Sequence, residues 1–364
     1  MNPCLPRLCQ PPSYKTTNIQ VKTIKTHRKS YIDILRGIAI FLVVFGHITH
    51  ISTLRTFIYG FHVPLFFFIS GLLFAPEKYK NFNEFIIKKF KTLIIPYVFF
   101  YLMTFSYWWL IESRIRSGEV TTHNQILGLF YGTYNMKYMF FNGALWFLPC
   151  LFTTEMLYFA IHKTDSYRHK FFRLFVVYAL GVILIQYNIK WLPWGGNAAL
   201  IACFFYGIGD MMKKRMVFIE TRPRFFHVII IIVCIAMQPL LMGHTKTYLA
   251  SLAINYYSCI PISLIGIALC LSSSILLDRN KVLEFIGINS LVIFAFQEQI
   301  YRMLIFVFSR ISGVAIEILR HDFVLCILIS FATIICITPL VFAYNRFFKP
   351  LLNNRRISSR IDKK

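Results

Sequence analysis

Acidic side chains are scarce in this sequence. Its 364 residues include 15 Asp and Glu against 39 Lys and Arg, which gives a formal net charge of +24. In a soluble chain that excess would indicate nucleic-acid binding. Here the basic residues lie between long apolar segments, as they do in the loops of membrane proteins. We therefore expect a lipid bilayer as a partner and no nucleic acid.

A leader sequence and paired cysteines are also missing. Residues 1–29 are polar and basic and contain no apolar stretch, so they are not a signal peptide, and we expect a disordered basic cytoplasmic tail. The nine cysteines do not show the spacing of a disulfide framework or of a zinc site. We expect no metal and no permanently bound cofactor.

Apolar runs are abundant, with 57% hydrophobic residues and a mean hydropathy of +0.59. Runs of this length predict helices, because a helix satisfies its own backbone hydrogen bonds within a membrane. We expect an all-α polytopic membrane protein with about ten transmembrane helices, forming a membrane domain over 30–348 that precedes a basic cytoplasmic tail over 349–364. The expected spans are 31–52, 57–75, 92–111, 144–162, 171–188, 198–212, 225–242, 249–276, 286–308 and 323–345.

The charge of the connecting segments orients these helices. With ten spans, the two tails and alternate loops have a net charge of +22, and the other loops have +5. Lys and Arg are retained on the cytoplasmic side. Both termini should therefore be cytoplasmic, with Arg36 just inside that face and His47 past the midplane.

The stretch Ser30–His50 places polar side chains along one face of an apolar helix. Arg36 and His47 are eleven residues apart, close to three helical turns or about 16 Å along the axis. Asp33 and His50 fall on the same face. Such groups are costly against lipid, so the pattern predicts a polar cavity in which His47 could exchange a proton. The structural alternatives are that Arg36 reaches lipid headgroups and that His47 only bonds a neighbouring helix.

The following stretch, FHVPLFFFISG at residues 61–71, contributes His62 and Ser70. His62 precedes a proline that disfavours helix just before it, and Ser70 lies beside a glycine that allows close backbone approach. Both residues could serve the same cavity. The alternatives are a helix start at His62 and a packing contact at Ser70.

Further candidates lie beyond the second predicted span. Lys88, Lys89 and Lys91 could hold phosphates on the cytoplasmic side, or simply follow the distribution of positive charge. Trp146 and Glu155 are two and a half turns apart, so one helix would point them to opposite faces. Trp146 could be an interfacial anchor, and Glu155 could be part of a structural ion pair.

Taken together, these motifs resemble the acyltransferase 3 family of integral membrane O-acyltransferases, in particular its branch similar to fucose 4-O-acetylases. The matching blocks occur in order, with Val63 in place of a methionine, lysines where arginines are common, and Gln297 where many members have a histidine. The blocks are D-x-x-R-G-I-A-I with G-H over 33–47, FHVPLFFFISG over 61–71, the basic cluster and IPY over 88–97, NGALWFLPCLFTTE over 142–155 and FIGINSLVIFAF over 285–296.

The resemblance implies a ten-helix enzyme that moves an acyl group, usually acetyl, from cytoplasmic acyl-CoA to a hydroxyl of a surface glycan. On that reading Arg36 contacts the donor and His47 is the catalytic histidine, acting as general base or acyl relay. The expected catalytic residues are His47, Asp33, His62 and Glu155, and the expected donor-binding residues are Arg36, Ser70, Lys88, Lys89, Lys91 and Trp146.

The expected function is therefore O-acetylation of a polysaccharide or glycoconjugate in the inner membrane of a bacterium. Acetyl-CoA is the donor substrate, and a glycan or lipid-linked sugar is the acceptor. A homo-oligomer or a separate extracytoplasmic transferase is the expected protein partner. The alternative is a secondary transporter or flippase for a sugar-linked lipid, which could also use buried Arg, His and Glu.

Overall fold

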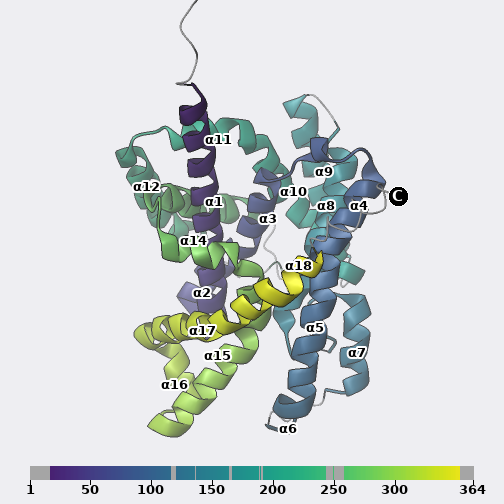
Figure 1. Ribbon diagram of the computed structural model, residues 1–364, viewed down its shortest axis with the longest axis vertical. Helices are drawn as coiled ribbons and strands as arrows, with labels where there is room; N and C mark the ends of the chain where they lie inside the picture. Colours follow the sequence, from purple (N-terminus) through teal and green to yellow (C-terminus); the bar gives the residue numbers. More distant parts are fainter. Residues whose placement is uncertain are drawn as a thin grey trace, which may run out of the picture.

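The computed structural model describes residues 17–115, 120–135, 137–163, 166–187, 189, 192–242, 249 and 258–352, and side chains from Ser30 onward. Within these ranges all regular secondary structure is helical (Figure 1). Eight helical stretches are long and apolar enough to cross a membrane: Ser30–Ile48, Ser52–Leu72, Phe82–Ile115, Gly143–Ile161, Tyr167–Gln186, Cys259–Leu276, Ser290–Ser312 and Phe323–Leu351.

Eighteen α-helices and several short 3-10 or π-helical turns make up these ranges. The helices are α1 Thr17–Ile48, α2 Ser52–Tyr59, α3 His62–Leu72, α4 Phe82–Lys89, α5 Ile95–Tyr107, α6 Ser113–Ile115, α7 Thr122–Tyr131, α8 Phe147–Ile161, α9 Tyr167–Gln186, α10 Gly196–Met212, α11 Met216–Glu220, α12 Arg224–Met242, α13 Cys259–Leu276, α14 Lys281–Ile288, α15 Ser290–Ser312, α16 Ile316–His321, α17 Phe323–Ala343 and α18 Lys349–Leu352.

The all-helical prediction is confirmed for the described residues, whereas the count of ten spans and the side of each terminus stay predictions. The segments expected at 198–212 and 225–242 form α10 and α12, but α10 has only 17 residues. The helix expected to begin at residue 249 is described from Cys259, and residues 250–257 lie outside the described ranges.

Three boundaries differ from the sequence-based expectation. Helix α1 already begins at Thr17, within the segment expected to be a disordered tail. Helix α18 extends to Leu352, and the tail beyond it lies outside the described residues. The single span expected over 57–75 is broken into α2 and α3 around Gly60, because Pro64 occupies the first turn of α3, where no backbone donor is needed.

Helix α1 lies at the centre of the arrangement and packs against α3, α13, α14, α15 and α17 (Figure 1). Its closest approach is to α14. A Cβ at Gly37 would lie 2.1 Å from the Leu283 carbonyl oxygen, and one at Gly287 would lie 1.7 Å from the Asp33 carbonyl oxygen. Both glycines belong to the sequence blocks singled out above, and their role here is to let two backbones touch. This contact sets the position of the α1 face that carries Arg36.

We expect Gly287→Ala to force α14 away from α1. The added methyl group would overlap the backbone, and overpacking of this kind costs about 1–3 kcal/mol. Thermal unfolding of the purified protein should show a clearly lower Tm. Val282→Ala, on the exposed side of the same helix, is the matched control and should leave the Tm unchanged. An unchanged Tm for Gly287→Ala would contradict the close packing.

Candidate active site

One cavity of about 770 Å³ lies between α1, α3, α15 and the segment that precedes α8. Arg36, His47 and His50 of the α1 stripe all line it, as their spacing predicts. The other lining residues that concern function are Arg55, Tyr59, His62, Ser70, Tyr134, Trp146, Glu298, Tyr301, Arg302 and Arg320. Polar groups from six or more separate segments therefore converge on one space.

Arg36 and Ser70 line one part of the cavity. Arg36 Nη1 donates to Asp33 Oδ1 at 3.2 Å, one helical turn away, so Asp33 orients the guanidinium without lining the cavity itself. Both side chains are half-buried. The Ser70 hydroxyl donates to the Phe66 carbonyl oxygen at 2.9 Å, which leaves its oxygen lone pairs available to a ligand.

His47 lies three turns further along α1. Its ring is 5.9 Å from the ring of Tyr59, which in turn lies 4.8 Å from the ring of His62. His62 Nδ1 donates to the Ile58 carbonyl oxygen at 2.9 Å, so its Nε2 is the acceptor nitrogen. Within the described residues the structure shows no hydrogen bond to the His47 ring. The imidazole of His47 is therefore open to a group that enters the cavity.

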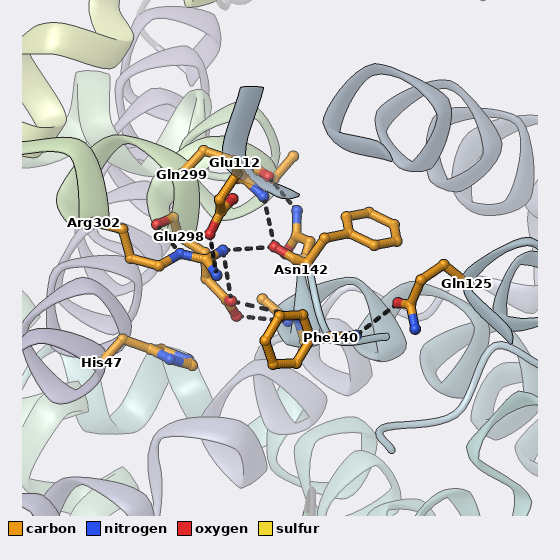
Figure 2. A network of polar contacts seen from close by, with 12 residues as sticks. His47, Glu112, Gln125, Phe140, Asn142, Glu298, Gln299 and Arg302 are labelled. Carbon is orange, nitrogen blue, oxygen red and sulfur yellow. Dashed lines mark hydrogen bonds and ion pairs between the residues drawn. The ribbon is translucent and has the colours of Figure 1, made fainter. Parts of the chain in front are cut away.

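A polar network faces His47 from α15. Glu298 Oε1 accepts from the Ala144 amide at 2.9 Å, and its Oε2 accepts from the Gly143 amide at 3.4 Å. These amides open the turn Gly143–Trp146 that leads into α8. Figure 2 shows the His47 ring pointing toward this network, with no contact drawn between them. Glu298 thus fixes the segment that carries Trp146 into the cavity wall.

Arg302 ties this network together. Its Nη1 lies 3.1 Å from Glu112 Oε1, and its Nη2 lies 3.3 Å from Glu298 Oε2. The guanidinium also donates to the Phe141 carbonyl oxygen at 2.5 Å, while its Nε donates to the Glu298 carbonyl oxygen at 2.7 Å. In Figure 2 Arg302 lies between the two carboxylates. One partly buried cation therefore balances the buried carboxylate of Glu298 and the partly buried carboxylate of Glu112.

Helix α16 closes the far end of α1. Arg320 donates to the carbonyl oxygens of His47 at 2.7 Å and Ile48 at 2.9 Å, where helix α1 leaves its last carbonyls without partners. His50 Nδ1 donates to Glu317 Oε2 at 3.0 Å. Burial is the main cause that lowers the pKa of His50, and the hydrogen bond from His50 lowers the pKa of Glu317.

A model of an acyltransferase domain, that of acyltransferase family 3, matches residues 29–345. The chain belongs to the acyltransferase 3 family. The match includes every helix that contributes to the cavity, so the cavity is part of a membrane acyltransferase domain. No curated protein and no solved structure matches the chain.

Besides Asp33, four residues expected in the acyltransferase site lie outside the cavity lining. Lys89 Nζ lies 2.7 Å from Glu155 Oε1, and this carboxylate is almost fully buried. Lys88 lies over the ring of Tyr79, at 5.1 Å from its centroid, and Lys91 is exposed. Trp146 lines the cavity and Glu155 does not, as expected from their positions on opposite faces. Glu155 is therefore placed as the partner of Lys89 rather than beside His47.

We expect Lys89→Met to destabilise the acyltransferase rather than to weaken donor binding. It would leave Glu155 buried without its cation, and breaking a buried pair in this way costs about 3–5 kcal/mol. The double variant Lys89→Met/Glu155→Gln should recover most of the lost thermal stability, and Lys91→Met should lose none. An unchanged Tm for Lys89→Met would contradict the structural role of this ion pair.

Several lining residues of the acyltransferase were not identified from the sequence. Glu298 and Arg302 are four residues apart in an apolar run, which places them on one helix face and was the available signal. Arg320 lies in the short segment between the spans Ser290–Ser312 and Phe323–Leu351, and Arg55 lies in the first turns of the span Ser52–Leu72, next to the segment that connects it to α1. A basic residue in such a segment is common in membrane proteins, so no sequence pattern distinguished these two.

Proposed function

We propose that this membrane acyltransferase moves an acetyl group from cytoplasmic acetyl-CoA to a sugar hydroxyl of a cell-surface polysaccharide or glycoconjugate. The observation that carries the proposal is the single cavity that joins Arg36 to His47 and continues to His50. An anionic donor head would be held at the Arg36 end. The acyl group would then lie beside an imidazole that has no other partner among the described residues.

His47 would act on the acceptor hydroxyl. As general base, it takes the hydroxyl proton while the oxygen attacks the thioester carbonyl, and the C–S bond breaks. The proton then passes from His47 to the departing CoA sulfur, so the products are the O-acetyl ester and CoA. In the alternative order His47 first accepts the acetyl group and releases CoA, and the hydroxyl takes the acetyl group in a second step.

The neighbouring residues would have distinct parts. Arg36, oriented by Asp33, is the donor-binding cation, and Ser70 and Trp146 line the same cavity. His62 would hold the Tyr59 ring and the edge of the acceptor space next to His47. Lys88 and Lys91 lie near Thr92 and Leu93, which line the cavity, so they could attract the phosphates of CoA before the donor enters.

The cellular setting belongs to the same proposal. The charge of the loops supports a cytoplasmic position for the Arg36 end, and the membrane would be the inner membrane of a bacterium. The likeness of the sequence blocks to the fucose 4-O-acetylase-like branch favours a sugar acceptor. A homo-oligomer or a separate extracytoplasmic transferase would be compatible with this arrangement.

The test is transfer of radiolabel from [acetyl-14C]CoA. Membranes from cells with the gene should label a glycan fraction that membranes from cells lacking it leave unlabelled. Propionyl-CoA and a long-chain acyl-CoA should be poorer donors. Equal labelling of both membranes would refute the proposal, and preference for a longer chain would correct the acyl group.

A further inference from the structure

The cavity is lined by more positive than negative side chains, and only some of the positive ones are paired with a carboxylate. Four arginines and one glutamate line it, together with three histidines. Arg36 is paired with Asp33, and Arg302 is paired with both Glu112 and Glu298. The other two arginines, Arg55 and Arg320, have no carboxylate within ion-pair distance among the described residues.

These two arginines lie at the same end of the cavity. Arg320 donates to the last carbonyls of α1 at His47 and Ile48, about three turns from Arg36. Arg55 belongs to the first turns of α2, which follows α1 directly, and its guanidinium lies 5.3 Å from the centroid of the Tyr59 ring. The charged groups that act on His47 are Glu298, Arg55, Arg302 and Arg320, so three cations face it against one carboxylate, and that carboxylate is paired with Arg302. The acceptor side of the reacting centre is therefore cationic.

Both guanidinium groups have N–H donors that make no hydrogen bond to the described residues. The Nε of Arg55 is buried and has no hydrogen-bond partner among the described residues. Within the described residues Arg320 uses two of its nitrogens for backbone carbonyls, although a guanidinium has five N–H donors. Burial is the main cause that lowers the pKa of Arg320; Tyr301 and Glu317 raise this pKa, and the positive charge of Arg55 lowers it. Arg55 therefore has a buried donor without a partner among the described residues, and Arg320 repels its charge. An anion bound between the two would accept from this donor and offset both charges.

We propose that the acceptor carries an anionic group, a carboxylate or a phosphate, that Arg55 and Arg320 bind while its hydroxyl faces His47. This inference rests on the proposed function and adds the chemical class of the acceptor. Planar guanidinium groups bind carboxylate and phosphate oxygens through paired hydrogen bonds, which would fix the orientation of the sugar. The anion would be either the carboxylate of an acidic sugar or the phosphate that links a sugar to its lipid carrier.

The test uses membranes from the source cell, with the full-length protein and its native acceptor. Transfer of label from [acetyl-14C]CoA is measured with methyl glucuronide, glucose 1-phosphate or methyl glucoside added as competitor. We expect one of the two anionic probes to inhibit at a concentration at least about 10-fold below that of the neutral glucoside, as a charge-assisted contact provides. Stronger inhibition by the glucuronide indicates an acidic sugar, and stronger inhibition by the sugar phosphate indicates the lipid-linked group.

Substitutions then test whether Arg55 is responsible for the preference for the anionic probe. In Arg55→Gln the preference for the anionic probe should disappear, and the KM for acetyl-CoA should stay unchanged. Arg310→Gln, an exposed arginine further along α15, is the matched control and should keep the preference. Arg320 is not the first choice, because it also caps α1.

Two results would overturn the inference while leaving the acyltransferase in place. In the first, all three probes inhibit equally, or none inhibits, while the wild-type membranes still label the glycan. In the second, inhibition by the anionic probe is relieved by excess acetyl-CoA, which would place the two arginines on the donor side. Absence of labelling in wild-type membranes would instead contradict the proposed function itself.

Discussion

His47→Ala should reduce acetyl transfer by about 10²–10⁴-fold, the range that general acid–base groups contribute. The reason is that His47 is the imidazole that faces the cavity three turns beyond Arg36, and its ring makes no hydrogen bond to the described residues that would give it a structural role. Binding of acetyl-CoA should persist, since Arg36, the residue proposed to bind the donor, is left in place. The measurement is kcat for transfer by the purified protein, together with donor affinity from isothermal titration.

The matched control is His123→Ala, which removes an exposed histidine of α7. It should leave kcat and the Tm at wild-type values. If His47→Ala retains most of the transfer activity while keeping its fold, another group must accept the hydroxyl proton. His62 would then be the next candidate, because its Nε2 is the unprotonated nitrogen.

Arg302→Met should be the most damaging substitution for the fold of the site. It would leave Glu112 and Glu298 without their shared cation and would also remove one of the two donors to the Phe141 carbonyl oxygen, the other being Gln299. Breaking a buried ion pair from one side costs about 3–5 kcal/mol. Thermal unfolding should therefore show a large drop in Tm, and transfer should be lost with it, because Glu298 positions the turn that carries Trp146.

Arg302→Lys distinguishes charge from geometry. A lysine restores one positive charge but cannot bond both carboxylates and the carbonyl at once. We expect a Tm between those of Arg302→Met and the wild type, and Arg310→Met on the exposed side of α15 should show no loss. A wild-type Tm for Arg302→Met would contradict this role, because the fold would then not depend on the shared cation.

The stripe on α1 could be predicted from the sequence because helical spacing alone fixes it. Arg36, His47 and His50 occur at intervals that any regular helix places on one face, and all three line the cavity. The opposite directions of Trp146 and Glu155 followed from the same geometry. Resemblance to the acyltransferase family likewise rested on local blocks, and the family match over residues 29–345 confirms it.

Contacts between distant segments could not be predicted in this way. The pairing of Lys89 with Glu155 and the cap that Arg320 places on α1 join residues far apart in the chain. The periodicity of one sequence shows which residues share a helix face, but it does not show which helices and loops contact one another. The division between α2 and α3 was predicted only in part: a helix start at His62 was one interpretation of the following proline, but the long apolar run over 57–75 favoured a single span.

Transfer across a sealed membrane tests the central claim most directly. Vesicles of one orientation are given [acetyl-14C]CoA on the side where Lys and Arg predominate, with the acceptor glycan on the opposite side. The account predicts labelled glycan on the far side and free CoA on the near side, and neither product with His47→Ala. Movement of the sugar-linked lipid without acetyl-CoA and without label on the glycan would contradict the account and would indicate a transporter.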